Sequence, residues 1–468
     1  MGASPAICLL AVALCLSGGF QQGYIASVLN QPYSHIEQFI NETIEERFSV
    51  GPSKNSLNVL WSSLNLMFPV AVIIGQFFAA YLCRTLGRKG TALLASALYI
   101  PGTLLCSASH PIRSFEMLFF GRLIWSLANG IQTVNATVWI VECAPPHIRG
   151  RAAALQEFAM AFGSLISQGA GVPFSTPEWW PLVFVPNLPF VVIAALIFCL
   201  LPDSPSSILE RSGDVDKAKG ALALYYGNDK DTEVLEVKKK AAVVTKEQRS
   251  VAWLFYPFSL NDDKARVIRT AAWIGVLVKI AYIATGARTL RAYTTFVLHS
   301  LSNSFIISII RIPVTLIPVF LVDRVGRRPL INFSMVITVL CLGVMVASVT
   351  LGHEYKLASL IAFGVHLLVN AAGLGAVSRF YAAELVPRNL LLSATSTLAA
   401  FEALTKILVD FAFYPMADVV GVWSLLMFLV PSFVLVVVLW RICPETSNRT
   451  VGQVLEDIGE RKKLAVTF

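Results

Sequence analysis

The tetrapeptide Leu86-Gly87-Arg88-Lys89 returns 239 residues later as Val325-Gly326-Arg327-Arg328. Two further motifs repeat 242 residues apart: Glu142 returns as Glu384, and Pro202-Asp203-Ser204 returns as Pro444-Glu445-Thr446. The chain has 468 residues, so these offsets are close to half its length. The spacing indicates that one half of the chain is a tandem copy of the other.

The composition is that of a membrane protein. Apolar residues make up 56% of the chain, only 14% is charged, and the mean hydropathy is +0.67. About 20 apolar residues cross the hydrocarbon core of a bilayer. Windows of that size lie near 5–28, 60–82, 91–109, 115–141, 152–173, 181–201, 268–290, 304–322, 330–351, 357–382, 393–416 and 420–441. The sequence therefore predicts an all-α membrane protein with twelve transmembrane helices in two six-helix repeats, an arrangement typical of secondary transporters.

The same pattern divides the chain into four parts. We expect an N-terminal six-helix bundle over 1–201, a cytosolic linker over 202–267, a C-terminal bundle over 268–443 and a cytosolic tail over 444–468. In the linker, 215–226 and 234–244 carry Lys and Glu at helical spacing, which predicts short amphipathic helices. The run at 238–240 either faces solvent or binds anionic membrane lipid.

The distribution of Lys and Arg predicts the orientation. Basic residues gather in the short loops on one side of the predicted spans and in the tail, which makes that side, with both termini, cytosolic. This bias accounts for the net charge of +8 without a nucleic-acid partner. Of four Asn-X-Ser/Thr sequons, only Asn41 falls in a predicted external loop, over 31–58, so we expect a glycan there. The plasma membrane is the expected location.

Nothing in the sequence indicates an enzyme, a cofactor or a metal site. The eight cysteines form no CxxC pair, and no HExxH motif, Ser-His-Asp grouping or phosphate-binding Gly loop has the required context. The expected partners are a small-molecule solute and membrane lipid, and the sequence leaves the oligomeric state open.

Several segments resemble known family motifs, in the family's order. They are FQQGYIASVLNQP at 20–32, FEMLFFGR at 115–122, the Glu142 and Arg149-Gly150 element, PDSPS at 202–206 and PETSNRT at 444–450. Together they resemble the sugar porter family of the major facilitator superfamily, and most closely the animal facilitative hexose carriers. The resemblance implies the major facilitator fold and transport of a hexose or related polyol by alternating access.

The repeated charges predict a cytosolic gate. Cations at helix ends can pair with acids of neighbouring helices and hold the inner side closed, although the same charges would also set the topology. The predicted gate consists of Gly87, Arg88, Lys89, Glu142, Arg149, Asp323, Gly326, Arg327, Arg328, Glu384 and Arg388.

The substrate site departs from the family pattern. The resemblance implies two Gln and an Asn in the seventh helix, where this chain has Tyr282 to Arg288, and it implies an Asn at Arg311 and a Gln at Glu157. In the tenth helix, 373–376 replace a Gly-Pro-Gly-Pro turn, and Arg379 replaces an aromatic residue. The candidate site residues are Gln22, Glu157, Gln168, Lys279, Tyr282, Arg288, Arg311, Arg379 and Glu402.

These charges allow two interpretations. Each charge costs about 2.5 to 3.5 kcal/mol in the middle of a transmembrane helix, so each must face protein or water. Glu402, Lys406 and Asp410 follow at intervals of four residues and share one helix face. The charges either neutralise one another as a buried network or recruit an anion, since cations outnumber acids in these spans.

Three functions remain open on sequence grounds. Facilitated diffusion of a hexose or polyol comes first, because Ile25 stands where proton-linked sugar porters typically carry Asp. An organic-anion carrier that uses Arg288 and Arg311 is the second, and a sensor of the same fold that transports no solute is the third.

Overall fold

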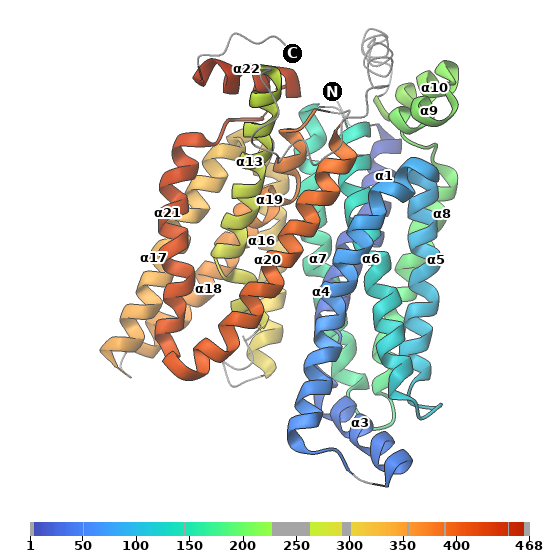
Figure 1. Ribbon diagram of the computed structural model, residues 1–468, viewed down its shortest axis with the longest axis vertical. Helices are drawn as coiled ribbons and strands as arrows, with labels where there is room; N and C mark the ends of the chain where they lie inside the picture. Colours follow the sequence, from blue (N-terminus) through green and yellow to red (C-terminus); the bar gives the residue numbers. More distant parts are fainter. Residues whose placement is uncertain are drawn as a thin grey trace. The chain divides into compact units, whose positions relative to one another are not determined.

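A computed structural model describes residues 4–49, 51–144, 146–226, 263–292, 301–352, 355–387, 390–447 and 449–462. Throughout these ranges the regular secondary structure is helical (Figure 1). Helices suit the bilayer because each satisfies its backbone hydrogen bonds internally. Each of the twelve predicted spans contains a helix, and eight helical segments of the described chain are long and apolar enough to cross a membrane. The predicted all-α membrane architecture is confirmed.

The chain forms two compact units, and their boundaries run through two long helices. Unit 1 comprises Met1–Trp139 and Phe158–Gly227, and unit 2 comprises Ile140–Glu157 and Asn228–Phe468. Helix α6 (Phe115–Cys143) lies mostly in unit 1, and the first part of α7 (Pro146–Phe174) belongs to unit 2.

Unit 1 begins with one long helical pass that contains a single π-helical turn. This pass consists of α1 (Pro5–Leu14), the π-helical turn η1 (Cys15–Gly19) and α2 (Phe20–Ser27). The other elements of unit 1 are, in chain order, α3 (Tyr33–Phe48), α4 (Lys54–Thr85), α5 (Gly87–Ala108), most of α6, the second part of α7, η2 (Trp180–Asn187), α8 (Leu188–Leu200), α9 (Pro205–Ser212) and α10 (Val215–Tyr226).

Glycine permits close helix packing in unit 1. A Cβ on Gly23 of α2 would lie 1.9 Å from the Met160 carbonyl oxygen of α7, and one on Gly163 would lie 2.1 Å from the Phe20 carbonyl oxygen. Small residues at both crossings let the two backbones touch, which is how helices associate where lipid supplies no hydrophobic driving force.

Unit 2 contains the first part of α7 and the C-terminal helices. These are α13 (Asp263–Ala284), α14 (Ala287–Ala292), α16 (Leu301–Val325), α17 (Arg327–Leu351), α18 (Lys356–Ala372), α19 (Leu374–Glu384), α20 (Leu391–Val420), η4 (Gly421–Leu425), α21 (Leu426–Ile442) and α22 (Val451–Arg461).

Two passes of unit 2 are broken in the middle. Helices α13 and α14 are separated at Gly286, which has φ +68° and lies against the Phe428 ring. Helices α18 and α19 are separated at Gly373, where the Ser334 hydroxyl accepts a hydrogen bond from the Leu374 amide at 3.0 Å. The tenth pass is therefore interrupted without the prolines of the family motif. Discontinuous helices of this kind typically line transporter binding sites.

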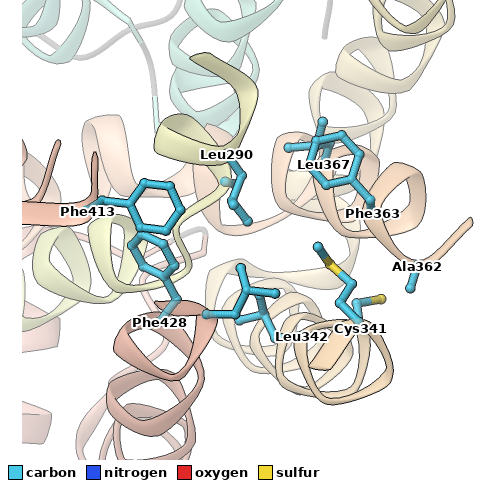
Figure 2. Packing of buried hydrophobic residues seen from close by; sticks show 11 residues of the cluster. Leu290, Cys341, Leu342, Ala362, Phe363, Leu367, Phe413 and Phe428 are labelled. Atoms are coloured by element: carbon cyan, nitrogen blue, oxygen red, sulfur yellow. The ribbon is translucent and has the colours of Figure 1, made fainter. Parts of the chain in front are cut away.

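An apolar cluster packs around the first of these breaks (Figure 2). Leu290 of α14, Leu342 of α17 and Phe363 of α18 belong to this cluster, and the rings of Phe413 and Phe428 lie 5.2 Å apart. These contacts hold α14 against the rest of the unit.

The predicted linker helices are described in part, and the predicted tail contains a helix that the sequence analysis did not predict. The amphipathic segment expected at 215–226 is α10, whereas 234–244 and the basic run at 238–240 lie outside the described residues. Helix α22 is amphipathic and buries Val454, Leu455 and Ile458, and Lys462 donates a hydrogen bond to Thr270 of α13 at 2.6 Å.

Candidate functional site

A carboxylate held by two arginines lies deep in unit 2. Glu157 of α7 is 1% exposed. Its Oε1 accepts a hydrogen bond from Arg311 Nη2 of α16 at 2.6 Å, and its Oε2 accepts one from Arg379 Nε of α19 at 2.7 Å. Pairing of both oxygens offsets much of the cost of burying the charge.

A second carboxylate repeats this pattern with lysines. Glu402 of α20 forms ion pairs with Lys279 of α13 and with Lys406, one turn further along α20. Each lysine contacts a different carboxylate oxygen. The structure thus brings these charges together as two carboxylates, each with two cations.

Tyr282 and Arg288 belong to the same cluster. The Lys406 ammonium lies 5.3 Å from the centroid of the Tyr282 ring, a cation–π distance. The charge of Arg288 acts on Lys406, and the charge of Glu402 acts on Arg379, so the two paired carboxylates form one electrostatic cluster.

The two predicted glutamines lie elsewhere in the fold. Gln168 of α7 and Gln22 of α2 belong to unit 1. Gln168 is buried and its amide donates to the Ser164 hydroxyl at 3.4 Å, whereas Gln22 is half-buried.

Both copies of the repeated tetrapeptide begin a helix in the same way. In unit 1, Gly87 has φ +80°, and Asp203 Oδ1 accepts from the amides of Arg88 and Lys89, at 3.1 and 3.2 Å. A carboxylate at this end of α5 satisfies amides that lack helical partners and complements the helix dipole. The Arg88 side chain is buried and pairs with Glu210 of α9 at 3.0 Å.

Unit 2 repeats the arrangement at α17. Gly326 has φ +94°, and Glu445 accepts hydrogen bonds from the amides of Arg327 and Arg328 at 2.8 and 3.0 Å. The buried Arg327 guanidinium pairs with Glu384 at 3.2 Å. Arg328 donates instead to the Trp440 carbonyl oxygen at 2.7 Å.

The remaining gate candidates are less fully described. Glu142 is buried in unit 2. The side chains of Arg149 and Asp323, and all of Arg388, lie outside the described residues.

Sequence reasoning missed the roles of Asp203, Glu210 and Glu445. The repeat of Pro202-Asp203-Ser204 as Pro444-Glu445-Thr446 was the available signal, since it pairs an acid with each copy of the tetrapeptide. Sequence alone could not show that these acids cap α5 and α17.

Asn41 lies half-buried on α3, the helix that follows the first pass. Among the described residues, no group of three or more His, Cys, Asp or Glu side chains is arranged to hold a metal ion.

The family model described as sugar (and other) transporter matches residues 10–457. The sheep "Solute carrier family 2, facilitated glucose transporter member 3" is 27% identical over 463 residues, which cover 95% of this chain and 91% of that protein. The human protein of the same name is 26% identical over 461 residues, covering 96% and 91%.

Solved structures show the same fold. The proton:xylose symporter XylE bound to 6-bromo-6-deoxy-D-glucose superposes with a TM-score of 0.83 at 18% identity, covering 97% of this chain and 98% of that one. The transporter FucP in its outward conformation superposes with a TM-score of 0.62 at 12% identity, and the match covers 93% of this chain and 97% of that one. These likenesses confirm the major facilitator fold. Because the family match spans residues 10–457, the chain belongs to the sugar (and other) transporter family, and it is a multi-pass membrane transporter rather than an enzyme.

Proposed function

We propose that the protein carries a small polar solute across the membrane by alternating access and facilitated diffusion. The observation that carries the proposal is the repeated arrangement at the ends of α5 and α17, where an acid caps the helix and a buried arginine pairs with a second acid. Ion pairs that break and re-form at such ends suit a carrier that alternates between two states.

A hexose or polyol is the first candidate solute. Family membership and the similarity to mammalian facilitated glucose transporters support this class. Glu157, Glu402 and Tyr282 supply acceptors and an aromatic face, groups that suit a hydroxylated solute.

Passive transport is supported by the pairing of the Glu157 carboxylate with two arginines, which disfavours its use as a proton carrier. Both of its oxygens accept hydrogen bonds from guanidinium groups, and Ile25 stands where proton-linked porters carry Asp. A solute-dependent proton flux would require another carrier group.

The proposed setting is the plasma membrane, with both termini cytosolic and the bundles divided at 201, 267 and 443 as the sequence predicts. The gate then consists of the paired residues at the ends of α5 and α17, together with the predicted residues outside the described chain.

Uptake into proteoliposomes tests this function. We expect labelled glucose, fructose or a polyol to equilibrate without accumulating, at a rate unchanged by an imposed pH gradient. Accumulation driven by the pH gradient, lost in Glu157→Gln, would overturn the passive mechanism. Solute binding without flux would favour the sensor instead.

One observation favours an organic anion as the second candidate. In the predicted spans of the site the cations Lys279, Arg288, Arg311, Arg379 and Lys406 outnumber the acids Glu157, Glu402 and Asp410 by two, so the sequence there carries an excess of positive charge. Simple carboxylates therefore belong in the same uptake panel.

A further inference from the structure

Among the residues that the structure describes, the charged cluster of unit 2 holds more cations than acids. Asp410 stands one turn beyond Lys406 on α20, although its side chain lies outside the described residues. Two charges in excess remain with Asp410 included. Excess charge in a water-poor interior is costly, and a bound anion would offset it.

Two buried residues of this region carry polar atoms that have no hydrogen-bond partner among the described residues. Arg311 is 6% exposed and uses Nη2 for Glu157, but its Nε–H donates to nothing. Asn370, at the C-terminal end of α18, is 1% exposed, and both its amide nitrogen and its amide oxygen lack partners. Buried polar groups are normally satisfied, so each of these requires an explanation.

Asn370 lies beside the lysine-rich part of the cluster. Asn370 Oδ1 and Tyr282 Cε2 both lie 3.4 Å from the position that a Cβ on Gly375 would take. Tyr282 in turn carries Lys406 on its ring face. The same Cβ would lie 2.8 Å from the Asn370 carbonyl oxygen, so Gly375 packs closely here, and the amide, the ring and the ammonium group lie together next to the break between α18 and α19.

The chemistry of these groups defines a ligand. Guanidinium and ammonium groups select a carboxylate, with which they form strong, charge-assisted hydrogen bonds. The Asn370 amide offers one donor group and one acceptor, which match a hydroxyl group. The aromatic face of Tyr282 suits a flat stretch of C–H bonds.

We infer that this region of unit 2, bordered by Arg311, Lys406, Tyr282 and Asn370, binds a small polyhydroxylated carboxylate. A sugar acid is the corresponding chemical class. The inference rests on the proposed carrier function, because it names the solute of that site. It also explains why cations stand where a sugar site would have amides.

Two readouts on the full-length protein test the inference separately from the carrier function. Thermal unfolding of the purified protein reports binding, with gluconate, glucose and chloride as probes. Proteoliposome uptake under an imposed membrane potential reports transport. We expect gluconate to raise Tm more than glucose or chloride, and gluconate uptake to increase when the interior is positive.

Asn370→Leu is the central variant. It removes unpartnered polar atoms from a buried position, so we expect Tm without ligand to stay unchanged or rise. We expect it to weaken gluconate binding about tenfold, the loss of roughly one good hydrogen-bonded contact. The matched control Arg441→Gln removes an exposed cation at the end of α21 in the same unit and should leave both readouts unchanged.

Arg311 is tested with its partner. Arg311→Gln alone leaves Glu157 with a single arginine and can fail to fold, so it is combined with Glu157→Gln, which removes the acid as well. We expect the double variant to keep a cooperative thermal transition, because the charge of Glu402 still acts on Arg379, and to lose the stabilisation by gluconate.

The outcomes separate the alternatives. Equal stabilisation by chloride and gluconate would assign the site to a bulk inorganic anion and overturn the solute assignment. Glucose flux without any gluconate effect would overturn the inference and leave the carrier function standing. Gluconate binding without flux of any solute would support the site and overturn the carrier function.

Discussion

At the scale of single residues, the buried Glu157 carboxylate is held by a guanidinium group at each oxygen. Removing one member of a buried ion pair leaves the other uncompensated, which costs about 3 to 5 kcal/mol. We expect Glu157→Gln to lower the free energy of unfolding by about this amount, because Arg311 and Arg379 would share only an amide oxygen. Thermal or denaturant unfolding in detergent measures the change.

The control is Glu178→Gln, an exposed acid in unit 1. A surface substitution of this kind changes stability by no more than about 0.5 kcal/mol. Equal stability of the Glu157 and Glu178 variants would show that the charge of Glu157 does not stabilise the fold through the two arginines.

His110 makes a second residue-scale prediction, outside the membrane spans. Burial, and then repulsion from Arg113, lower the pKa of His110 below its usual 6.5, while Glu42 acts in the opposite direction. The ring lies 5.6 Å from Phe39 and 5.6 Å from Trp180, centroid to centroid. These contacts hold α3 against η2 while the imidazole is neutral.

The sign of the pH effect follows from the lowered pKa. The unfolded chain binds the proton more readily, so the stabilising contribution is present above pH 6.5 and is lost as the pH falls through the lower folded-state pKa. We expect His110→Phe, which keeps the ring contacts, to reduce the fall in Tm between pH 7.5 and 5. An identical fall in both proteins would exclude His110 as its source.

At the scale of helices, the glycine before each capped helix sets the geometry. A Cβ on Gly326 would lie 2.6 Å from Glu445 Oε2, at a backbone φ of +94° that side chains rarely adopt. We expect Gly326→Ala to destabilise unit 2 by about 1 to 3 kcal/mol, the usual range for backbone strain at such a position. Unfolding measurements check the size of the effect.

Gly220 in the middle of α10 is the matched control. A Cβ there meets nothing within 4 Å, and the backbone is helical. Gly220→Ala should be neutral or stabilising by up to about 1 kcal/mol. The prediction fails if the two alanine variants have equal Tm.

The caps themselves make a further prediction. Glu445 accepts from the amides of Arg327 and Arg328, and Asp203 accepts from those of Arg88 and Lys89. Loss of a cap costs about 0.5 to 2 kcal/mol. We expect Asp203→Ala and Glu445→Ala, which remove the acceptor oxygens, each to lower stability within this range, and their effects to add because each cap belongs to a separate unit. A deviation from additivity larger than about 0.5 kcal/mol would argue against independent caps.

Sequence predicted the helices better than their interruptions and contacts. The apolar windows located every pass, because length and hydropathy decide what can cross a bilayer. At the break near Gly373, the Leu374 amide donates to the Ser334 hydroxyl of α17, a helix that precedes it in the sequence. The pairing of Glu157 with Arg311 and Arg379 joins three separate helices. Residue types at the site could be predicted, whereas the pairing between them depends on tertiary structure.

At the scale of the whole molecule, the proposed topology places α3 outside the cell. The Asn41 sequon includes Thr43, whose buried hydroxyl donates to the Phe39 carbonyl oxygen at 2.7 Å. That hydroxyl is inaccessible once α3 has packed, so a glycan at Asn41 must be attached before the helix folds. The glycan therefore reports the orientation of the chain during synthesis.

We expect the protein from animal cells to migrate faster after treatment with peptide N-glycosidase, and Asn41→Gln to show no such shift. Asn135→Gln and Asn332→Gln are matched controls, since these two asparagines lie buried on α6 and α17, and both variants should keep the wild-type shift. Tags at the two termini should be reached by antibody only after the cells are permeabilised, because both ends are proposed to be cytosolic. A glycan that persists in Asn41→Gln and disappears in Asn332→Gln would invert the topology, and it would place the capped ends of α5 and α17 outside the cell.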